Sequence, residues 1–325
     1  MKRFRRFMTR ALLAGVLAFL IVPFLIPFNS SGTLTAAQAA PGAEFVELAD
    51  VSVRVEVTPY SGVGSDAPLI VLMHGFGAST FSWRNVQEPL SKLGEVISYD
   101  RPAFGFTERK TSWVGTNPYG FEGNFEILDA LIAKYGASRQ VVLVGHSAGG
   151  QLAAEYTRLN LSKVSALILV DAAILTTGGG TSGFGWFFAL PQMQKLGPIL
   201  VSSIATSGDD LLRKSYYDQS KLTQAVYDGY HQPLKIKGWE QAFWDFTNAP
   251  RDNQLKDNLS QLTLPTLVIT GKYDEVVPAK DAVELQKLIA GSHIEIIDKT
   301  THLPQEEQPE LFMDAVVKHW EHLVK

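Results

Sequence analysis

The sequence predicts an α/β fold with a mostly parallel central sheet, helices on both faces and an inserted helical lid. Short apolar runs alternate with helical patterns along most of the chain, which is typical of parallel strands joined by crossover helices. The alternation stops between about residues 172 and 257, where helical patterns and aromatic residues replace the strands. With 325 residues, of which 46% are hydrophobic, the chain is long enough to bury a large core.

Eight apolar runs have the length and composition of strands. They span residues 45–48, 51–57, 69–73, 96–99, 141–144, 166–170, 266–269 and 294–297. Helical spacing predicts helices over residues 121–135, 148–159, 279–289 and 310–323. In such a fold the functional groups gather at the carboxyl ends of the strands.

The first 39 residues predict an export signal or a membrane anchor. An uncharged apolar run over residues 11–28 follows five cations, which are Lys2, Arg3, Arg5, Arg6 and Arg10. An A-x-A site at residues 37–39 favours cleavage before Ala40, whereas the apolar run approaches the roughly 20 residues of a membrane span. Both alternatives stay open. The positive-inside bias places the chain from about Ala40 onward outside the cytoplasm, so we expect a protein of the cell envelope, either membrane-anchored or secreted to the periplasm or beyond.

Composition excludes several classes of function. The formal net charge of −4 offers no basic surface of the kind that binds nucleic acid, so we expect no nucleic-acid partner. The chain has no cysteine, which excludes disulfides, a thiol nucleophile and cysteine-based metal sites. The sequence gives no indication of the oligomeric state.

The segment Gly145-His146-Ser147-Ala148-Gly149 is a G-x-S-x-G motif that lies between a predicted strand and a predicted helix. This context predicts a sharp strand-to-helix turn that holds the serine in a strained backbone conformation. Its hydroxyl would then lie at a helix N-terminus, where backbone N–H groups favour developing negative charge. Ser147 is therefore the predicted nucleophile, whereas His146 is expected to point elsewhere on the turn.

Four motifs together resemble the lidded α/β-hydrolases, and they carry the resemblance over about residues 44–323. The motifs are His74-Gly75-Phe76-Gly77, the stretch 100–107, the serine turn, and a terminal pair formed by Asp274 and His302. Asp274 occupies the G-x-x-D position of that family. His302 begins its H-x-x-x-x-E-x-P pattern, although Thr301 stands where the family usually has glycine.

The resemblance implies a role for each residue of the site. A serine hydroxyl needs a base within reach and an acid that orients the base, and the implied base and acid are His302 and Asp274. Asp171 is a rival acid, because some relatives place the acid after the earlier strand. The backbone N–H groups of Phe76 and Ala148 are the implied oxyanion hole.

The predicted organisation has three parts. Residues 1–39 form the signal peptide or anchor, residues 40–171 and 258–325 form the hydrolase core, and residues 172–257 form the lid. Gly178 to Gly180 are the expected hinge of the lid. Trp186 and Trp244 are its candidates for contact with an apolar small-molecule substrate.

The predicted function is hydrolysis of a carboxylic ester through an acyl-enzyme. Serine at position 147 argues against haloalkane dehalogenases and epoxide hydrolases, which resemble this chain but carry aspartate there. Three alternatives remain: hydrolysis of a carbon–carbon bond in a diketone-type substrate, amide hydrolysis of the iminopeptidase type, and a non-catalytic binding protein on the same fold. We expect no cofactor and no metal, since the glycines of residues 145–150 lack the Lys-Ser/Thr of a phosphate loop.

Overall fold

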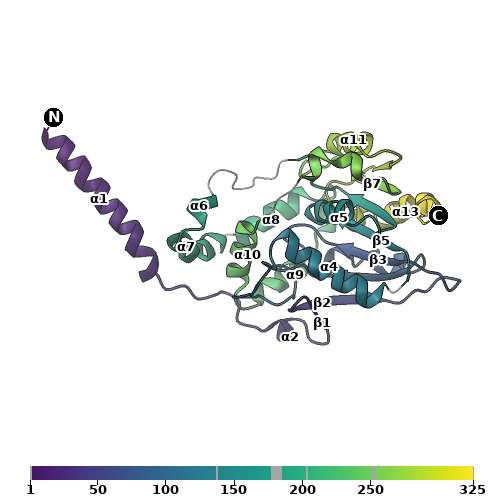
Figure 1. The fold of residues 1–325 in the computed structure, drawn as a ribbon, viewed down its shortest axis with the longest axis horizontal. Coiled ribbons are helices and arrows are strands. Elements are labelled where there is room, and N and C mark those ends of the chain that lie inside the picture. Colours follow the sequence, from purple (N-terminus) through teal and green to yellow (C-terminus); the bar gives the residue numbers. More distant parts are fainter. Residues whose placement is uncertain (1, 137, 177–184, 203, 251–253, 325) are drawn as a thin grey trace.

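A central eight-stranded sheet organises the computed structural model, which describes residues 2–136, 138–176, 185–202, 204–250 and 254–324 (Figure 1). The strand order is β1-β2-β4-β3-β5-β6-β7-β8. Only β2 runs antiparallel to its neighbours β1 and β4 among the described strands. The strands are β1 (Glu44–Leu48), β2 (Val51–Thr58), β3 (Leu69–Met73), β4 (Glu95–Tyr99), β5 (Val141–His146), β6 (Ala166–Val170), β7 (Thr266–Gly271) and β8 (His293–Ile297). The prediction of a mostly parallel sheet is confirmed, with all eight strands at the expected places.

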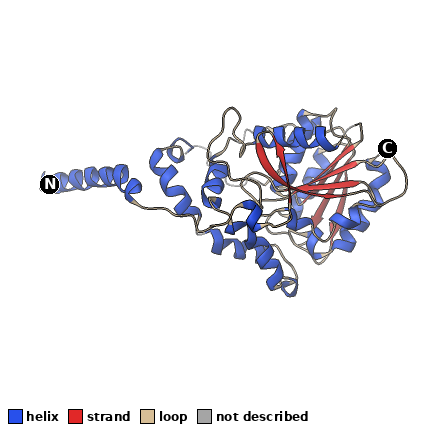
Figure 2. Ribbon diagram, turned by 90° about the horizontal axis from the view of Figure 1, so that it is seen from below, coloured by secondary structure: helices blue, strands red, loops and turns tan. Residues whose placement is uncertain are grey.

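Helices cover both faces of the sheet (Figure 2). They include α3 (Gln87–Leu90), α4 (Phe121–Tyr135), α5 (Ala148–Leu159), α11 (Ala279–Leu288), α12 (Pro304–Glu307) and α13 (Pro309–Leu323). Successive residues of a strand point to opposite faces, so Val71 of β3 packs in one core with α4, α5 and α11, and Ile70 packs in the other with α3 and α13. Burial on both faces explains why the central strands are continuous apolar runs.

The lid follows β6, and its described residues form helices joined by short turns and loops. Its α-helices are α6 (Gly185–Phe188), α7 (Pro191–Val201), α8 (Ile204–Lys214), α9 (Gln224–His231) and α10 (Trp239–Asn248). The short 3-10 helices η2 (Gln219–Lys221) and η3 (Gln232–Lys235) lie between them, and η4 (Leu255–Asp257) and η5 (Leu259–Gln261) lie between α10 and β7. The expected hinge at residues 178–180 lies outside the described residues.

The N-terminal helix α1 (Lys2–Leu25) projects from the rest of the molecule (Figures 1 and 2). It is the one described helix long and apolar enough to cross a membrane. Its apolar side chains are almost all exposed, including Leu12 and Leu17. A short helix, α2 (Ala36–Ala39), follows it before the sheet begins.

The turn between β5 and α5 determines where the serine stands. Ser147 has φ 51° and ψ −119°, a conformation that costs energy for a residue with a side chain. Neighbouring backbone fixes it: the Ser147 N–H donates to the Val170 carbonyl at 2.9 Å, and its carbonyl accepts from the Ala173 N–H at 3.1 Å. The first turn of α5 lies so close to the end of β3 that a Cβ on Gly149 would be 2.2 Å from the Met73 carbonyl oxygen.

This close approach predicts that Gly149→Ala is destabilising. The added methyl group meets backbone atoms that cannot rotate away, so we expect a loss of about 1 to 3 kcal/mol in the free energy of unfolding. Gly185→Ala is the matched control, because a Cβ there would have no atom of the described residues within 4 Å. Thermal denaturation of the two variants measures the difference, and equal midpoints would contradict the packing described for the turn.

Candidate active site

Ser147 lies in the wall of a cavity of about 210 Å³ between the carboxyl end of the sheet and the lid. His302 and Phe76 line the same cavity from the core side. Most of the lining is apolar, and nearly half of the lining residues come from the lid, among them Leu211, Leu212, Pro233, Leu234, Trp239 and Phe243. The fold therefore brings the predicted nucleophile and base, which are far apart in the sequence, to the wall of one cavity.

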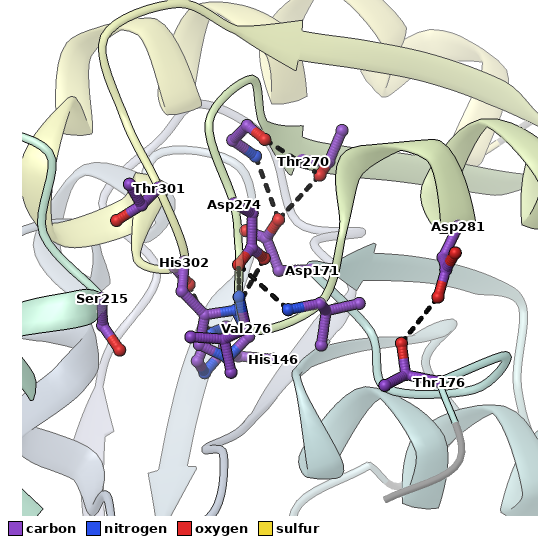
Figure 3. Close-up of polar contacts among 12 residues, drawn as sticks. His146, Asp171, Thr176, Ser215, Thr270, Asp274, Val276, Asp281, Thr301 and His302 are labelled. Carbon is purple, nitrogen blue, oxygen red and sulfur yellow. Dashed lines mark hydrogen bonds and ion pairs between the residues drawn. The ribbon is translucent and has the colours of Figure 1, made fainter. Parts of the chain in front are cut away.

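His302 and Asp274 form a buried pair. The Nδ1 atom of His302 lies 2.7 Å from Oδ2 of Asp274, and Oδ1 of Asp274 accepts from the N–H groups of Val276 and Val277 at 2.8 and 3.0 Å (Figure 3). Burial opposes ionisation of Asp274, but the hydrogen bond from His302 and its charge outweigh burial and lower the pKa of the carboxyl. A carboxylate in this place directs the proton of His302 to Nδ1 and leaves Nε2 free to act as a base.

The rival acid Asp171 is next to this pair (Figure 3). One ligand atom from each of Asp171, Asp274 and His302 falls within 4.8 Å of the others. Oδ1 of Asp171 accepts from the Thr270 hydroxyl at 2.8 Å and from the Gly271 N–H at 3.0 Å. Burial, together with the negative charge of Asp274, raises the pKa of Asp171 well above its ordinary value. Of the two neighbouring carboxyls, Asp274 therefore ionises more readily than Asp171.

Glu307 holds the loop that carries His302. Its Oε1 accepts from the Thr300 hydroxyl and from the Thr301 N–H, both at 2.9 Å, while its Oε2 accepts from the Tyr217 N–H of the lid at 2.6 Å. The Thr301 hydroxyl also reaches Oε1, at 3.4 Å. Threonine in place of the usual glycine is thus accommodated, because its side chain contributes to the hydrogen bonding of the same buried carboxylate.

His146 contacts the base, which the sequence did not predict. Its Nε2 lies 2.8 Å from the backbone carbonyl of His302, and the centroids of the two rings are 4.7 Å apart. Burial lowers the pKa of His146 to about 3, so the ring is neutral at physiological pH and donates from Nε2. His146 therefore holds the His302 loop in place through this hydrogen bond. The His146 side chain also lines part of the cavity.

The loop after β3 lies against the serine turn. A Cβ on Gly75 would be 2.8 Å from the His146 ring and 3.2 Å from the Ser147 Cβ. The Gly75 carbonyl accepts from His74 Nδ1 at 2.8 Å and from the Arg101 guanidinium at 3.1 Å, and His74 Nε2 accepts from the Arg101 N–H at 2.9 Å. These bonds fix the course of the loop immediately before Phe76.

The two implied oxyanion donors are the N–H groups of Phe76 and Ala148, from this loop and from the first residue of α5. Within the described part of the chain, neither N–H has a hydrogen-bond acceptor. Both remain available to a ligand atom beside Ser147.

The lid tryptophans singled out from the sequence do not line the cavity. Trp186 of α6 is 67% exposed, and Trp244 is buried inside the lid, where its indole N–H donates to Gln194 at 3.2 Å. The aromatic residues of α10 that reach the cavity are Trp239 and Phe243. For Trp244, the prediction failed because helical periodicity shows only that α10 has a buried face. It does not show which buried positions of that face pack inside the lid and which line the cavity.

Comparison with known proteins identifies the family. A model of the alpha/beta hydrolase fold family matches residues 68–309, more than half of the chain. The chain belongs to this family.

Two curated relatives of this α/β-hydrolase are enzymes with different substrates. A 2-hydroxy-6-oxo-2,4-heptadienoate hydrolase of Pseudomonas putida is 26% identical over 274 residues, which cover 78% of this chain and 89% of the relative. A monoacylglycerol lipase of Xenopus laevis, abhd6-A, is 25% identical over 248 residues, which cover 74% of this chain and 71% of the relative.

A solved structure extends the similarity of fold to the N-terminal segment. The crystal structure of a membrane phospholipase A, described as a bacterial virulence factor, matches with a TM-score of 0.65 at 19% identity. The match covers 99% of both chains, so it includes the region of α1. The chain is therefore a hydrolase by family, with an N-terminal extension that another member of the fold shares.

Proposed function

We propose that this α/β-hydrolase cleaves carboxylic esters through the nucleophile Ser147, the base His302 and the acid Asp274. The observation that carries the proposal is the convergence of three features: a strained serine at a helix N-terminus, a histidine bonded to a buried carboxylate, and a mainly apolar cavity that both side chains line. This arrangement supplies a nucleophile, a base and an apolar space for an acyl group.

The proposed reaction has two halves. The Ser147 oxygen attacks the ester carbonyl while Nε2 of His302 takes the serine proton, and Asp274 stabilises the imidazolium that forms. The N–H groups of Phe76 and Ala148 donate to the oxygen that becomes negative. His302 then protonates the departing alcohol, which leaves Ser147 acylated. A water molecule, deprotonated by His302, attacks the acyl carbon. As the bond from that carbon to the Ser147 oxygen breaks, His302 returns the proton to this oxygen, which releases the carboxylic acid and restores Ser147.

The charge of the cavity favours an uncharged ester. Arg109 is the one lysine or arginine among the described residues that line it. The Arg109 guanidinium already donates to the carbonyls of Phe104, Gly105 and Thr107 at 2.6 to 2.7 Å. A carboxylate on the substrate would therefore meet a guanidinium whose N–H groups mostly donate to backbone carbonyls already. Asp209 also lines the cavity, where its Oδ1 lies 2.7 Å from His231 Nε2, and its acidic side chain does not favour an anionic substrate. Apolar acyl or alcohol groups match the apolar majority of the lining.

Carbon–carbon bond hydrolysis is the second candidate, and the heptadienoate hydrolase relative is the observation that favours it. The same nucleophile and base can serve both reactions. Parallel assays with a neutral acyl ester and with a carboxylate-bearing dienoate diketone distinguish the two. If kcat/KM were higher on the dienoate than on the ester, carbon–carbon bond hydrolysis would replace ester hydrolysis as the proposed function.

Removal of the Ser147 hydroxyl tests the mechanism. We expect Ser147→Ala to fold normally and to lose roughly 10⁴- to 10⁶-fold in kcat, because the remaining groups have no nucleophile to activate. Ser215→Ala is the control, since this serine also lines the cavity but donates its hydroxyl to the Leu211 carbonyl. Esterase assays and labelling by a fluorophosphonate measure the effect. Near-native turnover of Ser147→Ala would refute the mechanism.

The two neighbouring acids give a second test. Asp274→Asn removes the charge that orients and stabilises the His302 imidazolium, so we expect a loss of roughly 10³- to 10⁴-fold in kcat. Asp171→Asn replaces the carboxyl that ionises less readily and leaves the bond between Asp274 and His302 in place, so we expect less than about a tenfold loss. Steady-state kinetics of both variants decide the assignment. Reversed losses would make Asp171 the acid of the triad.

The cavity lining predicts how the rate depends on acyl length. Each CH₂ buried in the cavity contributes up to about 0.8 kcal/mol, or about fourfold in kcat/KM, until the cavity is full. A series of p-nitrophenyl esters from acetate to decanoate measures this profile. Phe243→Ala should move the optimum of the profile to longer acyl chains, because Phe243 lines the cavity. Trp186→Ala should leave the optimum unchanged, because Trp186 is exposed and is not part of the lining. An identical profile in wild type and Phe243→Ala would show that the acyl group binds elsewhere.

A further inference from the structure

The segment after α1 is built into the lid. Residues 30–34, which we call the strap, lie between η3 and the start of α10. The N–H groups of Thr33 and Leu34 donate to the Lys235 carbonyl at 2.9 and 3.0 Å, and the Lys237 N–H donates to the Leu34 carbonyl at 2.9 Å. Strap and lid approach so closely that a Cβ on Gly32 would be 2.1 Å from the Ile236 carbonyl oxygen. The strap is therefore packed as an element of the lid and not as a linker.

A buried carboxylate depends on the strap. Glu240 of α10 is 0% exposed. It accepts from the Ser30 hydroxyl at 2.6 Å and from the N–H and hydroxyl of Ser31, both at 2.7 Å. These are all the hydrogen bonds that its carboxylate makes within the described residues. The Ser31 hydroxyl also accepts from the indole N–H of Trp239 at 2.9 Å, so the strap holds a residue of the cavity wall.

The helix that precedes the strap lies beside the apolar end of the lid. Phe19 of α1 stacks on Phe187 of α6, with ring centroids 5.9 Å apart, and α1 contacts α7. Next to this contact Trp186 is 67% exposed. The 24 residues of α1 span about 36 Å at 1.5 Å per residue, which exceeds the hydrocarbon thickness of a bilayer, about 30 Å.

We propose that the mature hydrolase keeps α1 as a membrane anchor and that the strap holds the α6–α7 end of the lid against the surface of the lipid bilayer. Cleavage before Ala40 would remove Ser30 and Ser31 and leave the Glu240 carboxylate with none of its donors, which is costly for a charge in that place. The stacking of Phe19 on Phe187 places the exposed Trp186 where α1 enters the lipid. The basic N-terminus of α1 marks its cytoplasmic end, so the catalytic part lies on the opposite side of the membrane.

Two measurements on the full chain test retention and orientation, and neither requires hydrolysis. Intact-mass analysis of the membrane fraction should find Met1 or Lys2 at the N-terminus, and a start at Ala40 would overturn the proposal. Because the chain has no cysteine, Trp186→Cys gives a single site for a nitroxide label. Leu288→Cys on α11, also an exposed apolar position at 42%, is the control far from α1 (Figure 1).

The labelled proteins carry Ser147→Ala, to protect the lipid, and are reconstituted in vesicles of phosphatidylethanolamine and phosphatidylglycerol. We expect the label at position 186 to be several-fold more accessible to oxygen than to a nickel chelate, and the label at 288 to show no such excess. Equal behaviour at the two positions would refute the orientation. Because this readout is independent of turnover, failure of the proposed esterase activity leaves it interpretable.

A pair of variants tests the strap itself. Ser30→Ala combined with Ser31→Ala removes the hydroxyls that bind Glu240 and leaves α1 unchanged. We expect the thermal midpoint to fall by about 4 to 8 °C while membrane association persists. Thr35→Ala is the control, because the Thr35 hydroxyl only caps α2. If both variants melt at the wild-type temperature, the strap does not hold the lid.

Discussion

The close contact between the start of α5 and the end of β3 is the constraint on which the site depends. The glycine at position 149 allows the helix N-terminus to approach the Met73 carbonyl, and this approach forces Ser147 into a conformation with positive φ. Backbone hydrogen bonds from the end of β6 hold the conformation in place. The hydroxyl, the free N–H of Ala148 and the loop that bears Phe76 are therefore placed together by packing, before any substrate is bound. Such preorganisation is the main source of stabilisation for a developing oxyanion.

A second layer of buried polar groups holds His302, the proposed base. Glu307 accepts from both residues that precede His302, and His146 donates to the His302 carbonyl. Because each of these groups is buried and paired, a displacement of the loop would break several hydrogen bonds at once.

Burial also determines how the two carboxyls behind the His302 imidazole share their charge. In a buried site two adjacent carboxylates repel each other, and the hydrogen bond from His302 gives the negative charge to Asp274.

The lid is joined to the core by polar contacts as well as by apolar packing. Glu306, fully buried, accepts from Arg84 and Tyr216 at 2.6 Å and also from Tyr230. Glu306, which directly precedes Glu307 in the chain, therefore links the core with two parts of the lid, the loop after α8 and the helix α9. The lid is thus tied at one end to the catalytic loop and at the other to the strap that follows α1. Its aromatic interior, including Trp244 and Phe246, fills the space between these two attachments.

The sequence by itself determined the order of strands and helices, the serine turn and the pair Asp274 and His302, because each depends on local patterns: apolar periodicity, small residues at a tight turn, and spacing after a strand. It also limited the acid to two residues. Only the tertiary structure decided that Asp171 and Asp274 are neighbours, that His146 braces His302, and that Trp239 and Phe243, not Trp186 and Trp244, face the cavity. Those contacts join residues that are far apart in the chain, so local patterns cannot predict them. Periodicity shows that a side chain is buried, but not which surface it is buried against.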